Sequence, residues 1–172
     1  MLPRRNAATL LTAFGLFSSS LQTSFAANRP VAARAPADPD ACALLTEEQV
    51  NAAIETKTLP GKHLVPTSTK ECIWSEDAKP NTDHRRVTLT INTLTSFNVG
   101  KSSKGLKTEP VSGVGDEAYY IVFSGDAPML VVRKGDSAFT VRVLNGAKAK
   151  ALTLDEEKAR DLSLGKAAAA KL

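Results

Sequence analysis

The fold class rests on the stretch Arg-Val-Thr-Leu-Thr-Ile-Asn-Thr, residues 86–93. Its apolar side chains, Val87, Leu89 and Ile91, alternate with polar ones. Alternation with a period of two predicts a strand with two unlike faces, one buried in the core and one turned to solvent. We therefore expect these three side chains in the core and the threonines between them on the exposed face.

Short apolar runs on either side of this stretch predict further strands. One run precedes it, and three runs follow it, separated by short turns rich in glycine, aspartate and proline. Turns this short join antiparallel hairpins, so the last three strands are expected to form a meander. The expected strands cover residues 71–74, 86–93, 118–124, 129–134 and 138–144, with Phe139, Val141 and Val143 facing inward.

A capping box marks the start of a short helix before the first strand. Thr46 and Gln49 stand three residues apart, so each side chain can cap the backbone amide of the other. Carboxylates in the first turn favour the helix dipole, and Pro60-Gly61 is expected to end the element. The sequence therefore predicts a helix over residues 46–57.

A second capping box, Thr153 with Glu156, opens a C-terminal helix. The alanine-rich segment that follows favours a helix as far as the chain end, although Gly165 is expected to weaken it by about 1 kcal/mol relative to alanine. Residues 100–115, rich in Gly, Ser and Lys, are expected to form a long mobile connection. Together these elements predict an α+β fold: a curved antiparallel β-sheet covered by an N-terminal and a C-terminal helix.

The first 26 residues have the pattern of a secretory signal peptide. Arg4 and Arg5 precede an apolar run and then small residues ending at Ala26, the order that signal peptidase recognises. The run is shorter than the roughly 20 apolar residues that span a bilayer, so no integral membrane insertion is expected. Residues 27–40, rich in proline and alanine, are expected to be a flexible tether, and residues 41–172 a single α+β domain.

The charge of the chain points to no polyanionic partner. The full sequence carries a formal charge of +4, and removal of Arg4 and Arg5 with the signal peptide leaves 20 basic against 18 acidic side chains. An excess of about two positive charges gives no reason to expect nucleic acid or an anionic membrane as a partner.

The two cysteines, Cys42 and Cys72, are expected to form a disulfide. An exported chain meets an oxidising compartment, where an even number of cysteines favours bridging. The closed loop of about 30 residues contributes roughly 3–4 kcal/mol in the chain-entropy model, and Trp74 is expected to pack beside the bridge. The alternative is a redox or metal pair, but the spacing differs from Cys-x-x-Cys and no histidine pattern accompanies it.

The two histidines of the chain, His63 and His84, give little indication of a catalytic site. Asp83 and His84 could form a hydrolytic set with a serine, but the chain contains no Gly-x-Ser-x-Gly elbow, and solvated turn residues are the simpler interpretation. Residues 113–118 match the dinucleotide pattern Gly-x-Gly-x-x-Ala, yet a strand is expected to follow instead of a helix. We therefore expect a tight turn there, and no catalytic residue, metal ligand or cofactor.

Five residues remain as candidates for a binding surface. Lys101, Lys104 and Lys107 are spaced like a basic patch but lack the interleaved aromatic residues of a nucleic-acid site. Tyr119 and Tyr120 are adjacent on an expected strand, where neighbouring side chains point to opposite faces. One tyrosine is therefore expected to face outward, where an aromatic ring suits a binding contact.

The run from Asp38 to Val50, with its Asp-Pro, Cys and Leu-Leu-Thr elements, resembles the start of a group of uncharacterised exported bacterial envelope proteins. A second cysteine near an aromatic residue, as in Cys72-Ile73-Trp74, and the Gly-x-Gly-Asp-Glu-Ala run of residues 113–118 are similar too. The resemblance implies a fold like the Mog1/PsbP sandwich and implies no activity. This chain departs from the group in lacking a lipidation cysteine and a glycine after Ile54.

Two classes of function follow from these expectations. The first is an exported, non-catalytic envelope protein, periplasmic or secreted, that binds an unknown envelope protein or a small ligand through its sheet face or through residues 101–115. The alternative is a small secreted hydrolase or metal-dependent enzyme that uses His84 with nearby carboxylates. The scarcity of reactive groups favours the first class.

Overall fold

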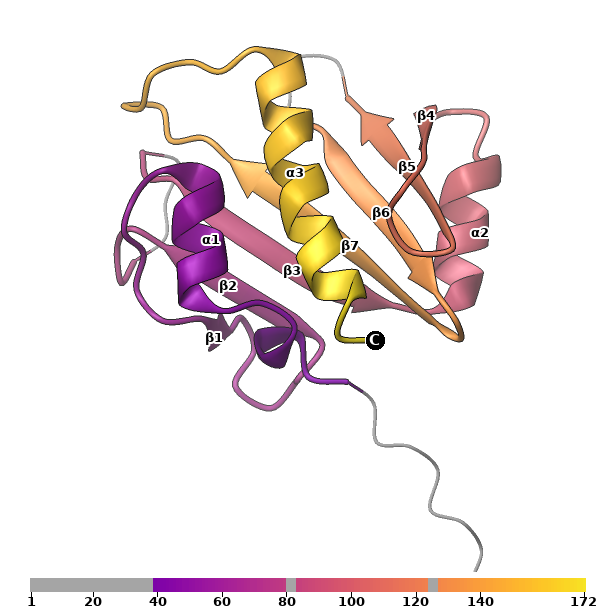
Figure 1. Ribbon diagram of the computed structural model, residues 1–172, viewed down its shortest axis with the longest axis horizontal. Helices are drawn as coiled ribbons and strands as arrows, with labels where there is room; N and C mark the ends of the chain where they lie inside the picture. The colour runs from indigo at the N-terminus through magenta and orange to yellow at the C-terminus, as the bar shows by residue number, and fades with distance from the viewer. Residues whose placement is uncertain (1–38, 80–82, 124–126) are drawn as a thin grey trace, which may run out of the picture. The chain divides into compact units, whose positions relative to one another are not determined.

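The computed structural model describes residues 39–79, 83–123 and 127–172 (Figure 1). Within these residues the chain has an α+β fold with seven strands in one sheet and three α-helices. The strands are β1 (Lys62–His63), β2 (Glu71–Ser75), β3 (Arg86–Asn92), β4 (Lys107–Val111), β5 (Glu117–Val122), β6 (Met129–Lys134) and β7 (Ser137–Leu144). The helices are α1 (Glu47–Ile54), α2 (Leu94–Ser102) and α3 (Leu154–Ala169), and a short 3₁₀ helix covers Ala41–Ala43.

Parts of the predicted organisation lie outside the described residues. These are the signal peptide over residues 1–26, residues 27–38 of the tether, and residue 124 at the end of a predicted strand. Asp40, placed in the tether by the sequence, instead caps the 3₁₀ helix, since its Oδ1 accepts a hydrogen bond from the amide of Cys42 at 2.8 Å. In the described part of the chain, no helix is long and apolar enough to cross a membrane.

The strands of the sheet all pair antiparallel, in the order β1-β2-β3-β7-β6-β5-β4. The central contact joins β3 to β7, which are far apart in the sequence, in a register that pairs Leu89 with Val141. The predicted antiparallel sheet is confirmed, as is the meander of the last three predicted strands, which are β5, β6 and β7. The α+β class is therefore confirmed.

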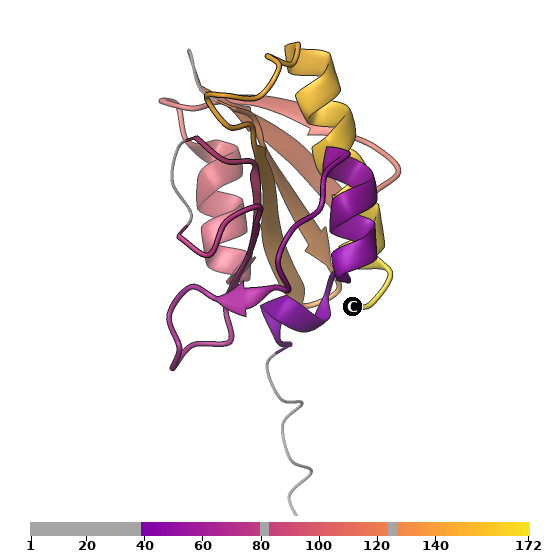
Figure 2. The ribbon, with the colours of Figure 1, turned by 90° about the vertical axis from the view of Figure 1, so that its left-hand side faces the viewer.

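Helices lie on both faces of the sheet (Figure 2). On one face α3 packs on β6 and β7 and against α1, and on the other face α2 contacts β6 and β7. Val87, Leu89, Phe139 and Val141 point into the core shared with α1 and α3, and all four are fully buried. A second, smaller cluster lies under α2 around Phe97.

The outer face of β3 is less exposed than predicted. Thr88 and Thr90 are half-buried, because their cross-strand neighbours on β2 and β7 stand beside them on the same face. On the same face, the side-chain nitrogen of Asn92 donates to the hydroxyl of Thr140 at 2.6 Å, so side chains of neighbouring strands are in direct contact there. The alternation itself holds along the whole strand.

The expectation of a long mobile connection over residues 100–115 is wrong. The segment contains the last turn of α2 and the whole of the edge strand β4. Thr93 caps α2 by accepting from the amide of Ser96 at 3.0 Å, and Phe97 is fully buried against Tyr119, with ring centroids 5.1 Å apart. A helix that buries one large side chain shows no clear helical period in its sequence, so composition alone suggested a loop.

Both predicted capping boxes are present, at Thr46 with Gln49 and at Thr153 with Glu156. The first helix is shorter than expected, because Glu55 takes a left-handed conformation with φ 55° and ends it before Pro60-Gly61. A residue in this region is a common helix stop, usually filled by glycine.

Gly165 has a packing role in addition to its cost in helix propensity. A Cβ at this position would lie 2.5 Å from Cδ2 of Leu130, a fully buried residue of β6. The missing side chain therefore lets α3 approach the sheet closely, and the alanines at its end, Ala168 and Ala169, are buried in the same core.

A buried carboxyl group joins α3 to the sheet. Asp161 is fully buried, its Oδ1 accepts from the amide of Val143 at 2.7 Å, and no described group hydrogen-bonds its Oδ2. Burial raises the pKa of Asp161 well above its ordinary value, and the nearby charge of Glu157 adds to the rise, although the Val143 amide and Arg142 act in the opposite sense.

This raised pKa predicts that the contribution of Asp161 to stability falls with increasing pH. Above the unfolded pKa of about 3.9, the unfolded state loses the Asp161 proton before the folded state does, so this contribution to the free energy of unfolding decreases as pH rises toward the folded pKa. The Asp161→Asn substitution keeps a side-chain oxygen that can accept from the amide of Val143, and it removes the group that ionises. In urea unfolding, the free energy of unfolding of this variant relative to that of the wild type should therefore increase between about pH 4 and pH 8. The exposed Asp155→Asn on the same helix is the control, and parallel curves for Asp161→Asn and wild type would contradict the prediction.

Candidate functional site

A pocket of about 500 Å³ lies between the C-terminal end of α2 and the hairpin that joins β4 to β5. Lys101 comes from α2, Thr108 and Pro110 from β4, and the remaining lining from residues 111–119. Val114 and Ala118 supply apolar atoms, and both are buried. This α2–hairpin pocket therefore joins an apolar wall to a polar rim, the usual composition of a ligand site.

Two glycines shape the hairpin. Gly113 and Gly115 have φ values of 77° and 59°, which favour glycine. A Cβ on Gly115 would lie 2.4 Å from the carbonyl oxygen of Arg133, so the hairpin approaches β6 more closely than any side chain would permit. The predicted tight turn is confirmed, and β5 follows it where a dinucleotide site would need a helix.

The carboxylates at the entry to β5 are held by specific partners. Asp116 accepts from the amide of Gly135 at 2.7 Å and from the ammonium of Lys134 at 3.1 Å. These two contacts lower the pKa of Asp116. Glu117 pairs with Lys101, which lowers the pKa of Glu117, and lies 3.6 Å from Arg133. The rim is therefore a set of paired charges fixed to the sheet.

The three candidate lysines do not share one environment. Lys101 lines the α2–hairpin pocket and pairs with Glu117. Lys107 lies on β4 and pairs with Glu109 at 3.1 Å. Lys104 is exposed in the link between α2 and β4, and neither Lys104 nor Lys107 belongs to the pocket lining. The structure thus places only the first of them at the pocket.

The expectation that one of the two tyrosines faces solvent is wrong. Tyr119 and Tyr120 point to opposite faces of β5, but helices cover both faces, and the residues are 3% and 5% exposed. The hydroxyl of Tyr119 donates to the carbonyl of Phe97 at 2.8 Å, and that of Tyr120 donates to the carbonyl of Lys158. Tyr119 still borders the pocket as part of its wall. Sequence reasoning missed this because it did not predict α2.

His84 lies between two carboxylates at the far end of the sheet. Its Nε2 is 3.4 Å from Oδ2 of Asp77 and its Nδ1 is 3.9 Å from Oε2 of Glu76. Asp83 instead pairs with Lys148 at 2.9 Å. The described residues that line the adjacent pocket include no serine, threonine or cysteine, so the serine that a hydrolytic set with His84 would need is not among them.

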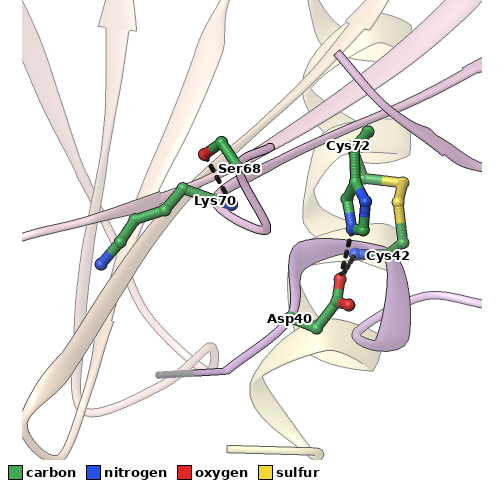
Figure 3. Close-up of a disulfide and its surroundings, with 6 residues drawn as sticks. Asp40, Cys42, Ser68, Lys70 and Cys72 are labelled. Carbon is green, nitrogen blue, oxygen red and sulfur yellow. Dashed lines mark hydrogen bonds and ion pairs between the residues drawn. A yellow bond between two sulfur atoms is a disulfide. The ribbon is translucent and has the colours of Figure 1, made fainter. Parts of the chain in front are cut away.

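The predicted disulfide between Cys42 and Cys72 is present (Figure 3). It joins the 3₁₀ helix to β2, and Trp74 on the same strand is 1% exposed. A Cβ on Gly61 would lie 2.5 Å from Nε1 of Trp74 and 2.9 Å from Sγ of Cys72. The backbone at Gly61 therefore packs directly on the indole and the bridge, which confirms that Trp74 lies in the core beside the disulfide.

His63 also lies at this bridge, which the sequence did not predict. The register of β1 with β2 pairs His63 with Cys72. Its Nε2 lies 2.9 Å from Oδ1 of Asp40, which also accepts from the amide of Cys42 (Figure 3). Contact with His63 lowers the pKa of Asp40. The carboxylate of Asp40, the imidazole of His63 and the sulfur of Cys42 thus lie within 4.8 Å of one another, and Cys72 is bonded to that sulfur.

Comparison of the chain with protein-family models, with curated proteins and with solved structures finds no match.

Proposed function

We propose that this chain is an exported, non-catalytic envelope protein, periplasmic or secreted, that binds a small ligand or a segment of another envelope protein in the α2–hairpin pocket. The observation that carries the proposal is the pocket itself, which combines buried Val114 and Ala118 with the polar groups of Lys101, Thr108 and Ser112. A few polar groups around an apolar wall are suited to fix a ligand's orientation.

The position of the pocket favours binding there over binding on the open faces of the sheet. Helices occupy both faces, so the sheet presents less free surface than a two-layer fold would. The edge strand β4 exposes Pro110 in the pocket lining and Lys107 outside it. Lysine and proline on an edge discourage unspecific strand pairing, which suits a site that accepts a particular ligand.

The charge pairs of the rim favour recognition over chemistry. Lys101 and Glu117 neutralise one another, as do Asp116 and Lys134, and each of these carboxylates has a lowered pKa. A general acid or base that works near neutral pH needs the opposite shift in a carboxyl group. The rim is better suited to hydrogen-bond a polar ligand than to exchange protons with it.

The exported location is proposed from two independent features. The order of basic, apolar and small residues over residues 1–26 is that of a signal peptide, and the Cys42–Cys72 bridge is typical of an oxidising compartment. The resemblance of residues 38–50 to exported envelope proteins supports the same location, and with it we propose a Mog1/PsbP-like fold with a curved sheet covered by the terminal helices.

Binding at the α2–hairpin pocket can be tested with a fragment library and ¹⁵N-labelled mature protein. We expect fragments with an apolar ring and a carboxylate to shift amide resonances of residues 108–119. Lys101→Ala should weaken these fragments about three- to tenfold, as for loss of one half-exposed charge. Lys104→Ala makes the same charge change outside the pocket and should leave the affinities unchanged. Hits that cluster around His84 would instead favour the hydrolytic alternative, and equal effects of the two lysine variants would contradict the proposal.

Export can be tested by intact mass spectrometry of the protein recovered from cells. The expected product begins near Ala27 and contains no free thiol. An alanine-to-arginine change at Ala26 should block processing, because the peptidase requires a small residue at that position. Full-length protein with reduced cysteines in the cytoplasmic fraction would rule out the proposed location.

A further inference from the structure

The point where the disulfide, His63 and Asp40 meet has the composition of a metal site. One ligand atom each of Asp40, Cys42 and His63 lies within 4.8 Å of the others, and all three residues are half-buried. Cys72 is bonded to Cys42 and stands opposite His63 in the β1–β2 register. Directly paired residues of antiparallel strands project to the same face, with Cβ atoms about 4.5–5.5 Å apart. Three potential ligands therefore lie together, and Cys72, bonded to one of them and paired with another, is the fourth candidate.

We propose that reduction of the Cys42–Cys72 disulfide turns this point into a zinc site in which Cys42, Cys72, His63 and Asp40 are the four ligands. Two thiolates, one imidazole and one carboxylate form a donor set suited to tetrahedral Zn²⁺. In the oxidised protein the two sulfur atoms are bonded to one another and supply no thiolate, so the site exists only in the reduced state.

The redox step needs a dithiol reductant. One thiolate of the reductant attacks a sulfur of the Cys42–Cys72 bond and forms a mixed disulfide, which the second thiol of the reductant resolves. The reductant leaves as its own disulfide, and the protein gains two electrons and two protons as two thiols. Zn²⁺ then binds the two sulfur atoms as thiolates, with release of both protons to solvent.

Zinc binding would require only a small increase in the distance between the ligand atoms of Asp40 and His63. Tetrahedral zinc with bonds of about 2.0–2.2 Å to nitrogen and oxygen separates these donors by about 3.4 Å, compared with 2.9 Å in the present ion pair. The amide of Cys42 already donates to the Asp40 carboxylate at 2.8 Å. An outer hydrogen bond of this kind orients a ligating carboxylate, and partial exposure of all three residues leaves an entry path for the ion.

Zinc at this point would replace the covalent link between the 3₁₀ helix and β2. The ligands belong to the two ends of that link and to β1, so the ion would hold the same segments together in the reduced protein. The consequence is a domain whose N-terminal segment is fixed by a disulfide in an oxidising compartment and by a metal ion when the disulfide is reduced.

Cobalt provides the direct test, because Co²⁺ in a thiolate site absorbs through thiolate-to-metal charge transfer and through intense tetrahedral d–d bands. Reduced, reductant-free mature protein should bind one Co²⁺ per chain with both signatures, and Zn²⁺ should displace it. Oxidised protein should show neither signature. Absence of charge-transfer absorption in the reduced wild type would overturn the proposal.

Variants identify the ligands. His63→Ala should weaken Co²⁺ binding to the reduced site by at least about 100-fold, since changes in the outer hydrogen bonds of a ligand alone cost 10–100-fold in metal affinity. His84→Ala removes the other histidine and should leave the affinity unchanged.

Asp40→Ala should also weaken Co²⁺ binding, whereas Asp40→His, which supplies another zinc ligand, should retain it. Folding of each variant is checked by circular dichroism in the oxidised form, and a His63→Ala variant that folds and binds Co²⁺ as tightly as His84→Ala would contradict the assignment. If His63→Ala does not fold, the Asp40→Ala variant decides: Co²⁺ binding as tight as in the wild type would reject the carboxylate as a ligand and with it the proposed site.

Discussion

The covalent link between Cys42 and Cys72 holds the N-terminal part of the described domain to the sheet. The segment it fixes contains the 3₁₀ helix and α1, which has only eight residues and would be marginal alone. At the other end of α1, Arg85 and Arg160 both donate to the carbonyl of Ile54, at 3.1 and 3.0 Å. The helix is thus held at its start by the bridge and at its end by two guanidinium groups, and its buried Val50 and Ile54 complete the core over β2 and β3.

The same arrangement explains why the candidate site lies at the opposite end of the sheet. Helices α1 and α3 occupy one face, and α2 covers part of the other. The α2–hairpin pocket is lined by Lys101 of α2, by β4 and by residues 111–119. Gly115 brings that hairpin against β6, and the Lys101–Glu117 pair ties α2 to β5. The binding site that we propose is therefore built by α2, β4 and β5, whereas the bridge and the buried Asp161 lie outside its lining.

Local patterns in the sequence predicted the elements that they specify by themselves. The alternation around Leu89, the two capping boxes and the antiparallel pairing of β5 with β6 and of β6 with β7 each involve residues close in the chain, and all are present. Helix α2 and the burial of both tyrosines were missed, because the contact between Phe97 and Tyr119 joins distant segments. The approach of His63 to Asp40 depends on strand register in the same way, and no spacing of metal ligands in the sequence indicates it.

The most direct test of the role of the bridge is hydrogen exchange on the oxidised and reduced mature protein in the presence of a metal chelator. Reduction is expected to remove protection first from residues 41–54, while the amides of β5, β6 and β7 keep theirs longer, because their ladder and the α3 contacts do not involve the bridge. Uniform loss of protection across the sheet on reduction would contradict a local role. Unchanged protection of α1 would show that its packing and the two arginines suffice without the bridge.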